Sequence, residues 1–383
     1  MSKGFDMRLV QRGGRLRRTP FFSATQKHGA KAYTVYNHML FPINFDDAEK
    51  EYEALCNDVT VWDVSVERNV EITGPDAFEF TNRLTPRDLS KCAIGQGKYV
   101  VITADDGGIV NDPVLLRLGE NHFWLALADS DVLLWAKGLA VNLDLDVSIT
   151  EPDVSPIQIQ GPKSKEVVEA LFGDKVLELK YYYFLDTSID GIPVIVTRTG
   201  WSAEIGFEIY LRDGSRGEEL WDRVIEAGKP HKIRPTGPSD IRRIEAGILN
   251  YGADMMLENN PFEVGLGWLV DKDKKADYVG KAALQRIKAA GVRRRLVGAE
   301  ISGERIEFNA TRWPVQIDGT SVGHVTSAIY SPRLKKNIGY AMLPIEHADL
   351  GTEVTVMVEG KDPRAATIVK KPFVDPTKDI PKS

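Results

Sequence analysis

Apolar residues follow two periods along the chain, one typical of helices and one typical of strands. After the acidic pair Asp46 and Asp47 they recur at helical spacing, which predicts an amphipathic helix that ends near Asn57. Short alternating strands follow, and Gly74-Pro75-Asp76 then begins a second predicted helix over 77–84. This interleaving favours a mixed α+β protein over a helix bundle or a β-sandwich.

A β-hairpin is predicted after these helices. Its strands, 98–103 and 109–118, flank the turn Asp105-Asp106-Gly107-Gly108, and the two glycines favour tight pairing of the strands. A further short helix is predicted over 129–137, closed by Gly138.

The pattern changes to a repeated β-α-β order from about residue 142. Strands are predicted at 156–160, 192–197 and 207–211, and helices at 163–172, 218–227 and 239–249. This order suits a ferredoxin-like sheet with helices on one face. After a linking helix over 280–290, short strands at 296–301, 315–317, 322–329 and 353–358 predict a small closed β domain.

A chain of 383 residues has room for two or three domains. We place an N-terminal α+β domain at 1–150, which also takes part of 235–280, a ferredoxin-like domain at 151–290 and a β-barrel domain at 291–383.

Charge and motifs narrow the function to a small-molecule site. Lys plus Arg total 49 against 55 for Asp plus Glu, a net charge of −6, which attracts neither nucleic acid nor an anionic membrane. The six histidines show no metal-ligand spacing, so no metal is expected. Phosphate-loop, zinc-protease, nucleophile-elbow and dinucleotide motifs do not occur.

The two cysteines and the N-terminal segment indicate a cytoplasmic location. Cys56 and Cys92 form no CxxC pair, and no signal peptide or membrane-spanning apolar run is visible. Arg15, Arg17 and Arg18 are expected to pair with acidic neighbours.

Several segments, in this order, resemble the folate-binding aminomethyltransferase family, whose best-known member is the glycine cleavage T-protein. They run from about residue 60 almost to the C-terminus and include Gly95-Gln96-Gly97-Lys98-Tyr99, Asp106-Gly107-Gly108-Ile109-Val110-Asn111-Asp112-Pro113, Thr197-Arg198-Thr199-Gly200-Trp201 and Gly206-Phe207-Glu208-Ile209-Tyr210. The resemblance implies three domains around a central folate cavity, the middle one ferredoxin-like and the last a small β-barrel or jelly roll.

The same resemblance implies roles for individual residues. Tyr99 corresponds to a tyrosine that lies against the folate, and Asp112 to the catalytic aspartate that faces its reactive nitrogens. Glu208 corresponds to the glutamate that accepts hydrogen bonds from the pterin. Arg243 corresponds to an arginine near the carboxylate-bearing end of the folate, and Tyr182 to a further pocket tyrosine.

The chain departs from the T-protein pattern where the one-carbon donor would sit. Ser65-Val66-Glu67-Arg68 replaces Ser-His-Met, Asn111-Asp112 replaces Asp-Asp, and Trp201 replaces a pocket tyrosine next to the folate. Segments 17–20, 33–38, 109–113 and 200–202 instead look like the dimethylsulfoniopropionate demethylase branch of the family.

That branch implies transfer of a sulfonium methyl group to N5 of tetrahydrofolate, with Asp112 positioning the folate and stabilising charge on N5. Aromatic side chains can hold the sulfonium cation, and we expect Trp201, Tyr33 and Tyr36 to do so, with Tyr210 behind them. His38 or a backbone donor would receive the propionate. Core packing is expected to account for at least two of these residues.

Other functions stay open at this point. The nearest are aminomethyl transfer, as in the T-protein, and folate-dependent demethylation of another donor. A non-catalytic folate-binding protein and an RNA-modification partner are more distant, because their Lys-Gly-Cys-Tyr-type motif and nucleotide-binding loop do not occur. The expected partners are folate and a small sulfonium compound, in a monomer or homodimer.

Overall fold

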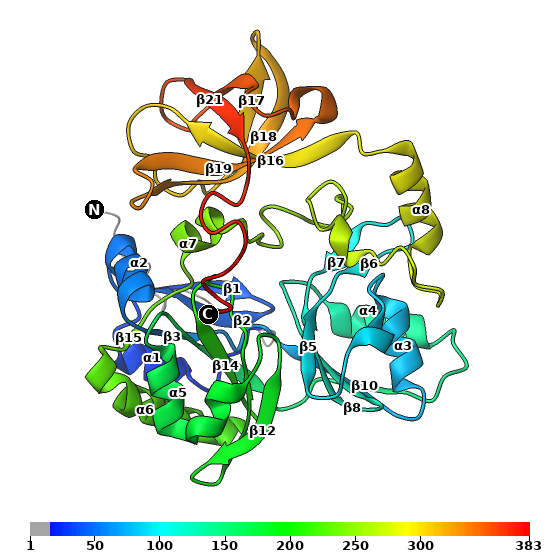
Figure 1. Cartoon of the computed structure of the whole chain (residues 1–383), viewed down its shortest axis with the longest axis vertical. Coiled ribbons are helices and arrows are strands. Elements are labelled where there is room, and N and C mark those ends of the chain that lie inside the picture. Colours follow the sequence, from blue (N-terminus) through cyan, green and yellow to red (C-terminus); the bar gives the residue numbers. More distant parts are fainter. Residues whose placement is uncertain (1–15) are drawn as a thin grey trace.

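The structure, a computed structural model, describes residues 16–383. Two α+β units lie side by side, and a closed β-barrel sits above them (Figure 1). The mixed α+β class and the C-terminal barrel are therefore confirmed.

The middle sheet has the strand order β12-β13-β14-β11-β3-β15. Its strands are β3 (Thr60–Asp63), β11 (Ser155–Gln160), β12 (Phe184–Ile189), β13 (Ile192–Thr197), β14 (Gly206–Leu211) and β15 (Arg234–Pro235). Helices α1 (Phe22–Lys27), α5 (Ser164–Phe172) and α6 (Gly217–Gly228) cover one face (Figure 1). Alternate strand residues such as Val61, Ile157 and Ile209 pack with these helices into one apolar core.

The opposite face of the middle sheet is polar and is also buried. Cross-strand register places Thr197 opposite Glu208, Glu208 opposite Gln158, and Gln158 opposite Trp62. Each of the four is at most 3% exposed. A buried polar face requires partners other than water, and it forms one wall of the site described below.

The outer sheet has the strand order β10-β4-β9-β8-β5. It contains β4 (Asn69–Thr73), β5 (Gln96–Tyr99), β8 (Val114–Gly119), β9 (His122–Ala126) and β10 (Ser148–Thr150). Helices α3 (Ala77–Leu84) and α4 (Val132–Ala140) pack on it and close a second apolar core. We predicted that α4 ends at Gly138, and this is wrong because Gly138 lies within the helix. The helix is capped by Val141, whose N–H donates to the Lys137 carbonyl.

The predicted hairpin is present but is split between two sheets. β5 pairs with β8 in the outer sheet, whereas β6 (Ile102–Thr103) pairs with β7 (Ile109–Asn111) on its own. The break falls at Asp112 and Pro113, where proline has no N–H for the ladder. Only its carbonyl is used, accepting from Val100 N at 3.0 Å. The interruption takes Asp112 out of regular strand pairing.

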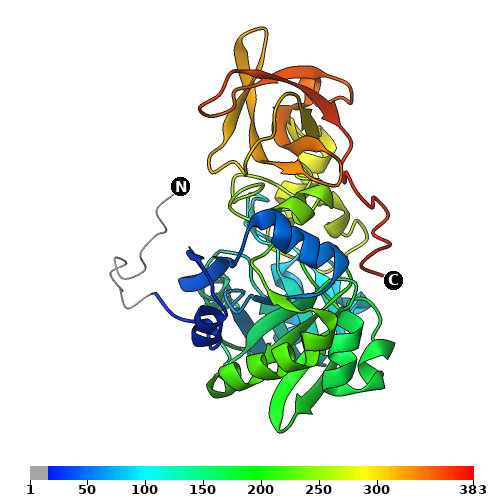
Figure 2. The ribbon, with the colours of Figure 1, turned by 90° about the vertical axis from the view of Figure 1, so that its left-hand side faces the viewer.

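The barrel follows helix α8 (Lys281–Ala290) and closes in the order β16-β19-β18-β17-β20-β21. Its strands are β16 (Arg294–Ile301), β17 (Trp313–Ile317), β18 (Thr320–Ser331), β19 (Lys336–Pro344), β20 (Glu353–Val356) and β21 (Arg364–Val369). The last residues then run back from the barrel to the two lower units (Figures 1 and 2). There Arg198 donates to the carbonyls of Pro381 and Ser383, which ties the barrel to the middle sheet.

Helix α7 (Asp240–Glu245) is shorter than predicted. We expected it to continue to Leu249, but Gly247 adopts a φ of +71°, a left-handed conformation that ends the helix. Helix α2 (Ala48–Asn57) matches its predicted range.

The predicted domain boundary at 150 falls between β10 and β11, and so between two sheets. However, β3 belongs to the middle sheet although it lies within 1–150. The middle sheet is thus assembled from segments that are distant in the sequence.

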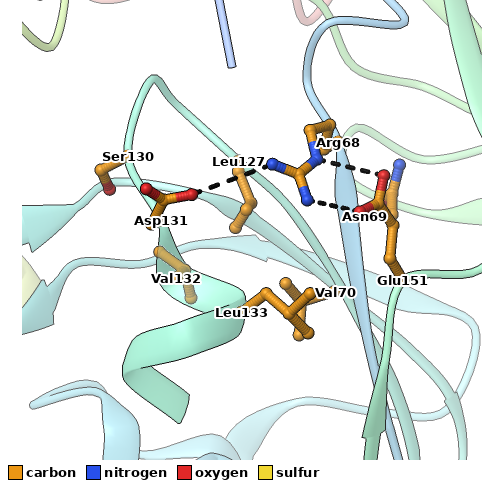
Figure 3. Close-up of a pocket in the computed structure, with 9 residues that line it drawn as sticks. All are labelled: Arg68, Asn69, Val70, Leu127, Ser130, Asp131, Val132, Leu133 and Glu151. Atoms are coloured by element: carbon orange, nitrogen blue, oxygen red, sulfur yellow. Dashed lines mark hydrogen bonds and ion pairs between the residues drawn. The ribbon is translucent and has the colours of Figure 1, made fainter. Parts of the chain in front are cut away.

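Arg17 and Arg68 both bind Glu151 and so fasten the N-terminal segment to the middle of the chain. Arg68 reaches Glu151 on one side and Asp131 on the other (Figure 3). The expected pairing of Arg17 with an acidic neighbour is confirmed, whereas Arg18 stacks on the ring of Phe22. Arg15 lies outside the described residues.

A tight hairpin joins β1 (Ala32–Tyr36) to β2 (Met39–Asn44). Its two turn residues, Asn37 and His38, have φ of +46° and +63°, as a type I′ turn requires. Asn37 also anchors the turn, because its amide donates to the carbonyls of Val66 and Ala128 and its N–H donates to Asp129.

Substitutions at Asn37 separate the contribution of its side-chain hydrogen bonds from that of its left-handed backbone conformation. N37A should lower the free energy of unfolding by about 2–4 kcal/mol, since it loses two side-chain hydrogen bonds and strains a left-handed residue. N37G, the control, loses only the hydrogen bonds and should lose clearly less. Urea unfolding measures both variants, and an N37A variant within about 0.5 kcal/mol of wild type contradicts the anchoring role.

Candidate active site

Asp112 and Tyr99 form the centre of the site. The Tyr99 hydroxyl, at the end of β5, donates to Asp112 Oδ2 at 2.8 Å. Asp112 Oδ1 is buried and has no hydrogen-bond partner within the described part of the chain. Burial raises the pKa of Asp112 to about 7, although the Tyr99 hydrogen bond acts in the opposite direction. An unused buried acceptor beside a fixed aromatic ring is suited to an N–H donor of a ligand.

Glu208 presents a second carboxylate from the polar face of the middle sheet. Its Oε1 accepts from Gln158 Nε2 at 2.7 Å, and its Oε2 accepts from Thr199 Oγ1 at 2.6 Å and Tyr210 OH at 3.0 Å. Burial raises the pKa of Glu208, and these hydrogen bonds limit the rise. The carboxylate is therefore held in one orientation, with Oε1 less occupied than Oε2.

Glu67 supplies a third carboxylate that the sequence reasoning did not place in the site. Burial raises its pKa well above the usual range, and the charges of Glu208 and Asp112 raise it further. The available signal was the replacement of Ser-His-Met by Ser65-Val66-Glu67-Arg68, which was noted only as a departure from the family pattern.

Tyr182 lies where the two sheets meet. It has a φ of +66°, and its carbonyl accepts from Gly97 N at 2.6 Å on β5. An isolated bridge between Gln96 and Tyr183 continues this contact. Burial raises the Tyr182 pKa, with contributions from Tyr181 and Glu208. The predicted pocket tyrosine thus lies beside the carboxylate of the middle sheet.

Aromatic side chains enclose the side of the site nearest the β1–β2 hairpin. Trp201 packs with Trp62 and Phe41, and the rings of Phe41 and Tyr36 are 5.7 Å apart. Burial raises the Tyr36 pKa well above its usual range, with Glu67 and Asp112 adding to the effect. The backbone N–H of Trp201 donates to the side chain of Gln158, which in turn donates to Glu208. Tyr36, Trp201 and Tyr210 are therefore brought together with the carboxylates.

Tyr33 and His38 are placed differently. Tyr33 bonds to Thr25 at 2.9 Å and packs on Phe22, so it faces α1 and not the carboxylates. Three positions separate it from Tyr36 on β1, and strand alternation directs the two side chains to opposite faces. His38 occupies the hairpin turn, and its carbonyl accepts from Arg17 N.

Arg243 lies at the barrel side of the site, and each of its three side-chain nitrogens donates a hydrogen bond within the protein. Its side chain is 0% exposed and binds Asp240, Asp254 and the Ser327 hydroxyl at 2.6–2.9 Å. The guanidinium lies 5.7 Å from the Trp201 ring. Because the side chain is fully buried and lies against the Trp201 ring, its geometry favours positioning of Trp201 over direct binding.

A different basic residue stands beside Tyr99. Arg87 donates to the Tyr99 carbonyl and stacks on Trp268, a tryptophan that is 60% exposed. The Tyr99 and Trp268 rings are 6.3 Å apart. The sequence analysis selected neither Arg87 nor Trp268.

Comparison with known proteins agrees with this architecture. Residues 21–274 match the family model of the GCVT N-terminal domain, and residues 294–375 match that of the glycine cleavage T-protein C-terminal barrel domain. The chain belongs to the glycine cleavage T-protein family.

Relatives in this family carry two different activities in their names. The dimethylsulfoniopropionate demethylase DmdA of Ruegeria pomeroyi is 40% identical over 342 residues, which is 89% of this chain and 93% of that protein. An aminomethyltransferase of Caldanaerobacter subterraneus is 32% identical over 364 residues, 94% of this chain and 96% of that protein. The expectation of a group-transferring enzyme is confirmed at the level of the family.

A solved structure shows the same fold. The aminomethyltransferase T of Bartonella henselae superposes with a TM-score of 0.84 at 24% identity, covering 94% of this chain and 98% of that one. The expected three-part architecture with its C-terminal barrel is confirmed by this likeness.

Residues 16–383 contain neither a membrane-spanning helix nor a cluster of metal-ligating side chains. No helix there is both long enough and apolar enough to span a membrane. No set of three or more His, Cys, Asp or Glu side chains in this range is arranged to hold a metal ion.

The raised pKa of Asp112 predicts a pH-dependent cost to stability. The pKa of Asp112 is 3.8 in the unfolded chain and about 7 in the folded protein. The free energy of unfolding therefore falls as the pH rises from about 4 to 7, because the buried carboxyl must then ionise. The ligand-free D112N variant should therefore be more stable than wild type at pH 8, by about 2–4 kcal/mol. The gain should shrink as the pH falls towards 4.

Urea unfolding at pH 5 and pH 8 measures this difference. The control is D105N, which changes an exposed aspartate in the turn of the same hairpin. Equal gains for D112N at both pH values would contradict a titrating buried carboxyl.

Proposed function

We propose that this chain is a tetrahydrofolate-dependent methyltransferase that demethylates dimethylsulfoniopropionate. The products are 5-methyltetrahydrofolate and methylmercaptopropionate. The observation that carries the proposal is the unused buried oxygen of Asp112, which Tyr99 holds in place near a further carboxylate, that of Glu67. The 40% identity to the demethylase of Ruegeria pomeroyi supports the choice of donor.

The residues present fit a folate. A pterin offers adjacent N–H donors, and Glu208 Oε1 and Asp112 Oδ1 are acceptors that the protein leaves partly or wholly unused. Tyr99 and Tyr182 supply aromatic faces next to these acceptors. Arg87 and Trp268, beside Tyr99, would meet the part of the molecule that leaves the site.

Bound tetrahydrofolate supplies N5 as the nucleophile: the N5–carbon bond forms, the carbon–sulfur bond breaks with its electron pair going to sulfur, and N5 loses its proton. Asp112 stabilises the positive charge that develops on nitrogen. With a pKa of about 7, its carboxylate is also suited to accept the released proton. Tyr99 fixes the orientation of that carboxylate.

The aromatic side chains bind the donor. Tyr36, Trp201 and Tyr210 enclose the carboxylates, and their faces attract a sulfonium at little desolvation cost. Holding the donor in line with the nucleophile lowers the activation free energy, and this orientation accounts for much of the rate enhancement of such a displacement. Tyr33 and His38 are not needed for this arrangement, and a role for His38 towards the propionate remains a prediction, as do the cytoplasmic location and the monomeric or homodimeric state.

Aminomethyl transfer is the second candidate. It is favoured by the 32% identity to aminomethyltransferases over 94% of the chain. One assay separates the two: the purified protein is given tetrahydrofolate with either dimethylsulfoniopropionate or the lipoate-bound glycine intermediate. Formation of 5-methyltetrahydrofolate with methylmercaptopropionate supports the proposal, and turnover of the second substrate alone would replace it.

D112N should reduce kcat by about 100-fold, since it removes the charge that stabilises the transition state. The dissociation constant for tetrahydrofolate should change by less than about fivefold, because an amide oxygen can still accept a hydrogen bond. Product formation and fluorescence titration measure the two effects, with D105N as the control. Unchanged turnover in D112N would refute the assigned role.

A further inference from the structure

Three carboxylates at the site have no cation of the described chain beside them. Among residues 16–383, none of Glu67, Asp112 and Glu208 forms an ion pair with Lys, Arg or His at 4 Å or less. Burial raises the pKa of all three. Buried negative groups without a counter-charge destabilise a protein, and a cationic ligand would remove that cost.

Glu67 differs from the other two carboxylates in having no hydrogen-bond partner among residues 16–383. Asp112 accepts from Tyr99, and Glu208 accepts from several donors. Within the described chain no side chain or backbone group donates to the Glu67 carboxylate, and its oxygens are not among the buried atoms that lack a partner. Glu67 is thus half-buried, and its carboxylate is left without a partner among the described residues.

The backbone around Glu67 is fixed on both sides. On one side the Glu67 N–H donates to the Val64 carbonyl at 2.9 Å and the Val66 carbonyl accepts from Asn37, and on the other side the Arg68 carbonyl accepts from Leu127 N at 3.2 Å. Arg68 forms ion pairs with Glu151 and Asp131 (Figure 3). Asn37 also donates to the Ala128 carbonyl, which accepts from Asn111 as well, so the segment of Glu67 is held close to the segment of Asp112.

Aromatic residues complete the surroundings of Glu67. Its charge raises the pKa of both Tyr36 and Tyr210, which places it near both rings. A carboxylate among aromatic faces is an arrangement that binds a soft organic cation through charge and cation–π attraction together.

We infer that Glu67 is the residue that selects a positively charged methyl donor, by facing the sulfonium group while the aromatic side chains enclose its methyl groups. The inference rests on the proposed function and assigns one part of it. Positive charge leaves sulfur in the transition state, so Glu67 stabilises the bound donor and acts on KM. Asp112, by contrast, acts on kcat because charge appears on nitrogen.

The first experiment compares E67Q and E67M with wild type. Glutamine keeps the shape of the side chain without the charge, and methionine removes its polarity. The KM for dimethylsulfoniopropionate should rise about tenfold or more in both variants, with kcat within about threefold. E71Q, on β4, is the control, since Glu71 binds His122 and Trp124 outside the site. Circular dichroism and Tm establish that each variant is folded.

A binding experiment gives a readout that does not need turnover. Calorimetry compares 3-(trimethylammonio)propanoate with 4,4-dimethylpentanoate, which has the same shape but no positive charge. Wild type and E71Q should prefer the cation by about tenfold or more, and E67Q should lose most of this preference.

The outcomes separate the inference from the proposed function. Demethylation by wild type with an unchanged KM and cation preference in E67Q overturns the role of Glu67 and leaves the function standing. A wild type that prefers the cation through Glu67 but forms no 5-methyltetrahydrofolate overturns the function and supports the role. If E67Q does not fold, E67M decides by the same two measurements, and wild type without any cation preference overturns the inference.

Discussion

The enclosure of Glu67, Asp112 and Glu208 near one another is the constraint on which the rest of the structure depends. Each carboxylate is desolvated, and the charges of Asp112 and Glu208 act on Glu67. Such a cluster lowers stability unless the surrounding protein holds it rigidly. That rigidity comes from the middle sheet, whose other face packs Val61, Ile157 and their neighbours against three helices. Packing of the apolar face thus offsets the destabilisation that the buried carboxylates cause.

Contacts between the units keep the cluster together. The bridge from Gln96 to Tyr183 joins the two sheets beside Tyr99. Asn37 holds the β1–β2 hairpin against Val66, which precedes Glu67, and against Asp129. Arg243 links α7 to Ser327 of the barrel, and its guanidinium lies over the Trp201 ring. The site is thus built at the meeting point of elements that are far apart in the sequence, and no single unit contains it.

Local patterns predicted the elements well because each depends on neighbouring residues. The helix after Asp46 and Asp47 and four of the six barrel strands follow from spacing and turn residues alone, whereas β19 and β21 were not predicted. The split of the hairpin at Pro113 depends on tertiary pairing, as does the direction of Tyr33 towards α1. Arg243 fits the family position, but its engagement by Asp240 and Asp254 becomes visible only when the chain is folded. The same holds for Glu67, whose open carboxylate is a property of the assembled site.

Ligand charge and proton binding are coupled in such a site. A bound cation favours the ionised forms of Glu67 and Asp112, so it lowers their pKa values and releases protons as it binds. The groups that face Glu67 are Asp112, Glu208, Tyr36 and Tyr210, and all of them have a raised pKa because of burial. The tyrosines stay neutral through the physiological range, so the carboxylates carry the coupling. Donor affinity consequently increases with pH until these carboxylates are ionised, and the binding of a cation prepares Asp112 as the negative group that methyl transfer to nitrogen requires.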